Sequence, residues 1–268
     1  MTNNVKIRKL TSMNDLRKMQ EVEEAVWQMP PNPVHQTYTA LNHGGVILGA
    51  FDGQAMVGFL YSFAGFDGSH SYLCSHMLGI LPDYRKGGLG ERMKLKQAEF
   101  AREIGYSMIT WTFDPLESLN AYLNLHKLGA TGAFYKKDHY GSMDDELNEG
   151  LPTDRIQIEW NLNTSTPAPK VTFDENKLMI DVTENGVPKS NLDRFNPIDD
   201  GWFVAVPDNF QSVKKKDINL AKEWRLKTRE AFQLLFDNGF TAKNFIRNHS
   251  KKHSYYYFTK TNYFTGGN

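Results

Sequence analysis

A glycine-rich stretch in the middle of the chain has the composition of an anion-binding loop. The apolar run Leu73–Leu81 has strand length, Pro82 ends it, and a helical pattern of apolar residues follows. Between them lie two cations and three glycines, namely Arg85, Lys86, Gly87, Gly88 and Gly90. Glycines allow backbone angles that side chains block, and N–H groups that lead into a helix start can hold a pyrophosphate. The alternative is an ordinary strand-to-helix turn.

The spacing of this stretch separates it from other glycine loops. Arg85–Gly90 fits R-x-x-G-x-G, which is neither the Walker lysine loop nor the dinucleotide G-x-G-x-x-G. With Pro82, Asp83 and Tyr84 before it, the segment resembles the acyl-CoA-binding motif of the GNAT superfamily of N-acyltransferases. The resemblance covers about residues 5–162. It implies an α/β (α+β) fold with a GNAT-like mixed, mostly antiparallel sheet flanked by helices.

The resemblance also implies which residues bind the co-substrate, acetyl-CoA or another acyl-CoA such as succinyl-CoA. In the family, the strand before the loop bonds pantetheine through its backbone, and those positions fall on Leu78 and Ile80. The family asparagine that touches pantetheine falls on Ser118. The loop amides that take the pyrophosphate are those of Arg85, Lys86, Gly87, Gly88, Leu89 and Gly90.

Acyl transfer to an amine needs a base for the ammonium, a hydrogen-bond donor for the thioester oxygen and a proton for the leaving thiolate. The resemblance implies that a backbone N–H at a bulge of the fourth strand serves the oxygen. His76, two residues before Leu78, is the predicted base, because an unperturbed histidine titrates at about pH 6.5. A histidine satisfied within the core is its alternative. Glu23, Glu24 and Asp114 are the other candidate bases.

Two more candidates follow the predicted fifth strand. In the family, side chains at the end of that strand face the chemistry, so Asp114 is predicted to recognise an ammonium group or orient the acceptor; a plain turn at Asp114-Pro115 is the alternative. The family tyrosine that often protonates the thiolate falls on Leu125. Tyr122, one turn earlier on the same helical face, is predicted to supply a phenol instead, with a packing role as its alternative.

Hydrophobic periodicity predicts the elements that position these residues. Strands are predicted at residues 5–10, 45–51, 54–63, 73–81, 106–113, 134–143 and 154–162, and helices at 16–29, 89–104 and 116–128. Leu89, Met93, Phe100 and Ile104 mark the predicted buried face of the second helix. Residues 30–41 are predicted to be a loop, which the resemblance places over the acceptor.

Composition argues against several classes of protein. The 31 basic residues balance the 31 acidic ones, so we expect neither a nucleic-acid partner nor a membrane partner. No apolar run reaches the ~20 residues of a membrane span, and the first residues lack a signal-peptide core. Cys74 is the single cysteine, and the histidines show no metal-ligand spacing. We therefore predict a soluble, cytoplasmic protein without a metal.

Two domains are predicted: a GNAT-like acyltransferase domain at residues 1–162 and a small α+β domain at residues 171–268. The linker between them, residues 163–170, is small, polar and proline-bearing. In the second domain we predict a helix at residues 218–237 and strands at 177–182, 202–206, 241–247 and 255–259. No glycine loop precedes that helix, so no second nucleotide site is expected.

The predicted function is transfer of an acyl group, acetyl or longer, from coenzyme A to the amine of a small molecule such as an amino acid. Acetylation of a protein N-terminus or lysine is the second enzymatic hypothesis. A non-catalytic acyl-CoA-binding protein is the hypothesis from a different class, and Leu125 in place of the tyrosine favours it. The quaternary structure stays open, with a homodimer as one option.

Overall fold

The computed structural model describes residues 4–141, 143, 148–164, 167–248 and 250–260. Its residues form two compact units, one of Met1–Trp111 with Trp160–Ser165 and one of Thr112–Glu159 with Thr166–Asn268. The chain therefore leaves the first unit inside a strand rather than at a linker. These units differ from the predicted domains 1–162 and 171–268, because residues 112–159 pack with the C-terminal part of the chain. We describe each unit by itself.

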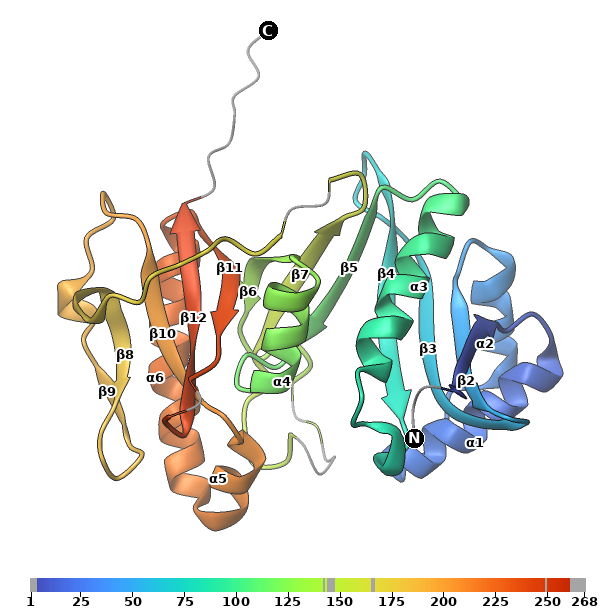
Figure 1. The fold of residues 1–268 in the computed structure, drawn as a ribbon, viewed down its shortest axis with the longest axis horizontal. Helices are drawn as coiled ribbons and strands as arrows, with labels where there is room; N and C mark the ends of the chain where they lie inside the picture. The colour runs from blue at the N-terminus through green and yellow to red at the C-terminus, as the bar shows by residue number, and fades with distance from the viewer. Residues whose placement is uncertain (1–3, 142, 144–147, 165–166, 249, 261–268) are drawn as a thin grey trace, which may run out of the picture. The chain divides into compact units, whose positions relative to one another are not determined.

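The first unit is built on a sheet in the strand order β1-β2-β3-β4-β5 (Figure 1). The β4–β5 pair is parallel and the other neighbours are antiparallel. Its elements are β1 (Lys6–Lys9), α1 (Met13–Trp27), α2 (Val34–Asn42), β2 (Ile47–Asp52), β3 (Ala55–Phe66), β4 (Ser71–Ile80), a 3-10 turn (Pro82–Tyr84), α3 (Leu89–Glu103) and β5 (Met108–Phe113), whose last two residues belong to the second unit.

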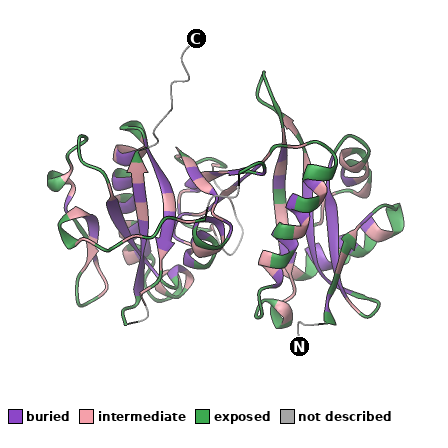
Figure 2. Ribbon diagram, turned by 45° about the horizontal axis from the view of Figure 1, so that its top comes forward, coloured by how far each residue is buried: buried purple, intermediate pink, exposed green. Residues whose placement is uncertain are grey.

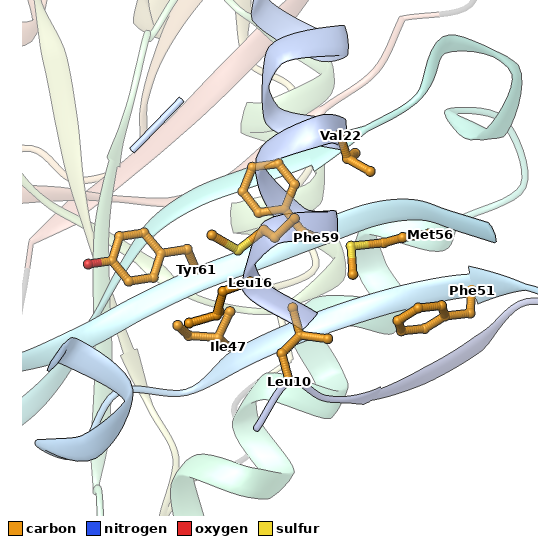
Figure 3. Packing of buried hydrophobic residues seen from close by; sticks show 9 residues of the cluster. Leu10, Leu16, Val22, Ile47, Phe51, Met56, Phe59 and Tyr61 are labelled. Atoms are coloured by element: carbon orange, nitrogen blue, oxygen red, sulfur yellow. The ribbon is translucent and has the colours of Figure 1, made fainter. Parts of the chain in front are cut away.

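Helices α1 and α2 cover one face of this sheet and enclose its hydrophobic core (Figure 3). Ser12 caps α1, because its hydroxyl accepts a hydrogen bond from the Asp15 N–H at 3.1 Å. Buried residues of α1, among them Leu16, meet Phe59 and Tyr61 of β3, which share one side of that strand.

Helix α2 replaces the loop that we predicted at residues 30–41. Three prolines precede it, and Pro33 is its N-cap residue. A proline at a helix start costs nothing, because the first helical N–H groups have no partner within the helix. The prolines therefore mark the start of a helix here, and not a continuous loop.

The second unit has the strand order β7-β6-β11-β12-β10-β8-β9. Here β8 and β10 pair in parallel, and the other described neighbours within this unit are antiparallel. Its elements are α4 (Ser118–Ala121), a π-helix (Tyr122–Lys127), β6 (Thr131–Lys136), β7 (Arg155–Asn161), whose last two residues belong to the first unit, a 3-10 turn (Glu175–Lys177), β8 (Leu178–Val182), β9 (Pro188–Ser190), a 3-10 turn (Leu192–Arg194), β10 (Trp202–Pro207), α5 (Phe210–Lys216), α6 (Ile218–Asp237), β11 (Phe240–Ile246) and β12 (His253–Lys260).

The mixed, mostly antiparallel fold predicted from the sequence is confirmed. Figure 2 shows that the strands of each unit are largely buried and that the outward faces of the helices are exposed. The predicted helix at residues 116–128 is the least regular element: α4 has one turn, and the π-helix follows, with the Leu128 N–H donating to the Leu123 carbonyl at 3.0 Å. Across the described ranges, no helix combines the length and hydropathy needed to cross a membrane.

Candidate active site

The glycine loop lies between β4 and α3. Arg85, Lys86, Gly87 and Gly88 are exposed, Gly90 is half-buried, and Leu89 is buried at the start of the helix. Gly87 and Gly88 have φ angles of 98° and 76°, in the left-handed region that glycine enters at little cost. Gly88 is also the N-cap residue of α3 and has no side chain to cap the helix. With Arg85 and Lys86 beside it, this helix end is suited to bind phosphate oxygens.

Hydrogen bonds hold the approach to this loop in place. The Arg85 Nε donates to the carbonyl of Ile80, the last residue of β4, at 3.0 Å. The Tyr84 hydroxyl donates to the Asp52 carboxylate at 2.8 Å. The first turn of α3 also contains an acidic residue, Glu91, which competes with an anion for the positive helix end.

Strands β4 and β5 part soon after they meet. Among the described residues, they pair at Leu73 with Ile109 and at Cys74 with Thr110. Beyond Cys74, β4 continues to Ile80 and stays paired with β3 on its other edge. The edge of β4 that carries the predicted pantetheine residues, Leu78 and Ile80, is therefore not paired with β5 in the described register.

Strand β4 contains a β-bulge at His76. Tyr61 pairs with Met77 and Ser62 pairs with Ser75, so His76 has no opposite residue on β3. The bulge confirms the irregularity expected in the fourth strand. It also changes the alternation of side chains. Met77 lies on the same side of the sheet as Tyr61, and Ser75 lies on the other side, together with Ser62. Ser75 and Met77 therefore point to opposite faces of the sheet, whereas residues two apart in a regular strand point to the same face.

The ring of His76 lies on the side covered by α1 and α2. It contacts the rings of Tyr61 and Phe63, with centroid distances of 5.9 and 5.7 Å. The residue is nevertheless exposed to solvent on its remaining side. Desolvation by the surrounding protein lowers the pKa of His76 below its ordinary value of 6.5, so the imidazole is neutral at neutral pH and can accept a proton.

A second acid–base group, the carboxyl group of Glu23, lies near the Tyr61 ring. Glu23 of α1 is 4% exposed, and desolvation raises the pKa of its carboxyl group above the ordinary value. Its Oε1 accepts hydrogen bonds from the Asn32 N–H at 3.0 Å and from the Asn32 Nδ2 at 2.6 Å. The same Nδ2 lies 3.1 Å from the Met77 sulfur, next to the bulge.

The opposite face of β4 carries a buried lysine that sequence analysis missed. The Lys94 Nζ of α3 donates to the Ser75 hydroxyl at 2.8 Å and lies 3.6 Å from the centroid of the Trp111 ring. Lys94 is 3% exposed, and no described carboxylate forms an ion pair with it. Burial lowers the pKa of Lys94 from 10.5 to about 7, while the nearby Cys74 works in the opposite direction. Gln97, also buried, accepts a hydrogen bond from Ser75 at 3.2 Å.

The remaining predicted residues belong to the second unit, and Asp114 is engaged there. Its carboxylate lies 2.5 Å from the Arg225 Nη2 and 3.5 Å from the Arg155 Nη1. Arg225 is 1% exposed. Burial by itself lowers the pKa of Arg225, but the carboxylates of Asp114 and then Asp154 raise it, and the net shift is upward. These pairs commit Asp114 to a buried charge network, so a role in acceptor recognition stays a prediction.

Ser118 and Tyr122 lie at the irregular helix of the second unit. The Ser118 hydroxyl donates to the Pro207 carbonyl at 2.6 Å, so it is committed to the fold, and its pantetheine contact stays a prediction. Tyr122 is half-buried and stacks on His126 with a centroid distance of 4.6 Å, while Arg247 lies over its ring at 4.9 Å. Leu125, in the family tyrosine position, is fully buried.

The chemistry that these groups permit is proton transfer beside an anion site. In the first unit, His76, Leu78, Ile80 and the glycine loop follow one another along the β4–α3 segment, and their roles stay predictions. The described residues contain no group of three or more His, Cys, Asp or Glu side chains that could hold a metal ion.

Comparison with known proteins places this segment in a family context. Residues 12–130 match the profile of the acetyltransferase (GNAT) family. A comparison with curated proteins found no match. Among solved structures, the Salmonella typhimurium protein yncA, determined with its cofactor acetyl-CoA, shares 17% identity and a TM-score of 0.50, over 63% of this chain and 100% of that one. The ribosomal-protein-S18-alanine N-acetyltransferase of Escherichia coli shares 15% identity and a TM-score of 0.48, over 63% of this chain and 99% of that one.

Proposed function

We propose that the chain is an acyl-CoA-dependent N-acyltransferase whose acceptor is the amine of a small molecule, because residues 12–130 match the acetyltransferase (GNAT) family. One observation carries the placement of the reaction: β4 parts from β5 beyond Cys74 and leads directly into the glycine loop. An acyl-CoA bound with its pyrophosphate at the loop would run along the free edge of β4. Its thioester would then lie near the bulge at His76.

The residues of the chain then take the following roles. Arg85, Lys86 and the loop amides bind the pyrophosphate, and the backbone of Leu78 and Ile80 binds pantetheine. His76 takes a proton from the acceptor ammonium, so that the neutral amine can attack the thioester carbonyl. The C–N bond forms, the C–S bond breaks, and the thiolate leaves as a thiol after it receives a proton. Tyr122, which belongs to the second unit, is the candidate for that proton from the sequence alone.

Ligand-dependent thermal stability tests this function first. We expect acetyl-CoA or succinyl-CoA to raise the melting temperature and NADH to leave it unchanged. A ligand at about 100 times its dissociation constant adds roughly 2.7 kcal/mol to the free energy of unfolding, which is readily measured. If no acyl-CoA shifts the transition, the function is wrong. If acyl-CoA binds but no amine is acylated, the chain is a binding protein, as the leucine at position 125 would suggest.

The loop itself is tested by Gly88→Glu. A Cβ at Gly88 meets only the Glu91 side chain, at 4.0 Å, so the new residue has room, and its negative charge lies where we place the pyrophosphate. We expect the dissociation constant for coenzyme A to rise tenfold or more, measured by isothermal titration calorimetry. Gly53→Glu is the matched control, since Gly53 also has a positive φ, 58°, and open space around it but lies in the β2–β3 turn. Equal affinity in both variants would remove the loop from the site.

The proton donor is tested by Tyr122→Phe. We expect kcat to fall about tenfold, because water can partly replace a lost general acid, with no change in coenzyme A affinity. Tyr257→Phe, in β12, serves as the control and should retain full activity. An unchanged kcat in Tyr122→Phe would mean that this ring only packs against His126 and Arg247.

A further inference from the structure

The carboxylate of Glu23 has one oxygen that no described group satisfies. Its Oε1 is held by both donors of Asn32, at 3.0 and 2.6 Å, whereas its Oε2 is buried and has no hydrogen-bond partner. The Asn32 carbonyl is itself held by the Gln20 side chain at 2.8 Å. The carboxylate is therefore fixed in orientation through one oxygen, while the other is buried without a donor among the described residues.

A buried carboxyl oxygen without a hydrogen-bond partner costs free energy whether the carboxyl group is ionised or protonated. The ionised carboxylate lacks a donor for Oε2, and the protonated carboxyl would lack an acceptor for its O–H. Buried charges in proteins are ordinarily paired, and no described cation forms an ion pair with Glu23. A ligand that carries N–H donors and a positive charge would complete the arrangement.

The surroundings of Glu23 connect it to the proposed reaction. Asn32 lies 3.1 Å from the sulfur of Met77, the residue that follows His76 on β4. Tyr61 is close enough that the charge of Glu23 helps to raise the Tyr61 pKa, after the larger effects of burial and of Cys74. Met77 is half-buried and His76 is exposed, so the cluster runs from a buried carboxylate to solvent.

These groups would also suit the body of an amine. Tyr61, Phe63 and His76 form a continuous aromatic wall, with a Tyr61–Phe63 centroid distance of 6.0 Å. Aromatic rings offer apolar area at a low cost in conformational entropy. A ligand with a cationic end and an aromatic or apolar body would match both parts of the cluster.

We propose that Glu23 is the acceptor-binding residue, whose Oε2 receives an N–H of the acceptor ammonium while an aromatic or apolar body lies against Tyr61 and Phe63. This inference rests on the proposed function and names its substrate class, a cationic primary amine. Asn32 acts as a positioning residue, because it fixes the carboxylate through Oε1. His76, on the same wall, then takes the proton.

Binding of a charged and a neutral probe tests the inference on the full chain with acetyl-CoA bound. Phenethylamine carries the cation, and phenethyl alcohol is its neutral analogue of similar shape. We expect the wild-type protein to bind the amine at least tenfold more tightly than the alcohol, as measured by calorimetry. Glu23→Gln should lose most of that preference, because the amide keeps the shape and removes the charge.

Glu21→Gln is the matched control, since Glu21 lies two residues earlier in the same helix and is exposed. It should keep the wild-type preference for the amine. The inference is overturned if the wild-type protein binds neither probe, binds both equally, or if Glu23→Gln keeps the preference. A thermal shift with acetyl-CoA in the same sample separates these outcomes from failure of the proposed function, which would abolish that shift.

Discussion

Replacing His76 by alanine should lower kcat by about a hundredfold or more, the usual contribution of a positioned general base. The imidazole lies at the bulge of β4, exposed on one side and held against Tyr61 and Phe63 on the other. Its loss removes the proton acceptor and leaves the glycine loop untouched. Coenzyme A affinity should therefore stay unchanged, measured by calorimetry beside steady-state rates of thiol release.

The pH profile gives a second test of the same residue. A general base acts in its neutral form, and the pKa of His76 lies below its ordinary value because the surrounding protein disfavours the charged ring. The wild-type rate should rise with pH through that lowered pKa and level off near neutrality. His76→Ala should lack this limb. A wild-type limb that survives in the variant would assign the base to another group, such as Glu23.

His70→Ala is the control for this experiment. His70 is exposed in the turn between β3 and β4, on the same β-hairpin as His76, and it takes no part in the proposed site. We expect its rate and pH profile to match those of the wild-type protein. Equal losses in both variants would point to a disturbed hairpin instead of a missing base.

Replacing Lys94 by methionine should stabilise the protein at and below neutral pH. The lysine is buried, its ammonium has no described carboxylate partner, and its pKa is lowered to about 7 in the folded protein. Each pH unit of displacement corresponds to about 1.4 kcal/mol, so the shift from 10.5 corresponds to a penalty of at most about 5 kcal/mol. The hydrogen bond to Ser75 offsets roughly 1 kcal/mol of this.

The direction of the pH dependence follows from proton binding. Between pH 7 and 10.5 the unfolded chain holds the Lys94 proton more tightly than the folded protein, so wild-type stability rises with pH across that window. Below pH 7 both states are protonated and the full penalty applies. Lys94→Met should therefore gain most over wild type at pH 6 and progressively less towards pH 10. Urea unfolding at these pH values measures the difference.

Lys96→Met tests whether the effect belongs to the buried position. Lys96 lies two residues away on α3 and is partly exposed, with its ammonium 2.6 Å from Glu99. Its replacement should change stability by less than about 1 kcal/mol. If Lys94→Met were less stable than wild type at every pH, the contacts of its ammonium with Ser75 and Trp111 would outweigh the cost of burial.

The sequence predicted the helices and strands in which apolar residues recur at a regular spacing. Helix α6 begins and ends where the apolar spacing indicated, at Ile218 and Asp237, and the strands of the first unit lie within a few residues of their predicted bounds. The predicted buried face of α3 was partly wrong, because Ile104 is 49% exposed while Lys94 and Gln97 are buried. A period based on apolar residues cannot find polar side chains that tertiary contacts bury.

The candidate site likewise has one part that the sequence predicted and another that it did not. The glycine loop was predictable, because its residue types carry their own backbone requirements. The partnership of Glu23 with Asn32 was not, since nine residues and a helix end separate them in the chain. Asp114 looked like a free carboxylate, and its distant partner, Arg225, becomes visible only once the chain has folded. Pairings across long sequence separations are beyond the reach of local patterns.

The bulge at His76 has a consequence for how this protein can vary. Deleting that one residue would leave Ser75 and Met77 opposite Ser62 and Tyr61 and make the pairing regular, whereas deleting Leu78, beyond the bulge, would turn the following residues to the other face. Gly79 now faces Phe59 and Trp27, where even a Cβ would lie 2.6 Å from the Phe59 ring, so a turned strand would force a larger side chain into that space. Related proteins should therefore keep the number of residues between Met77 and Gly79 unchanged.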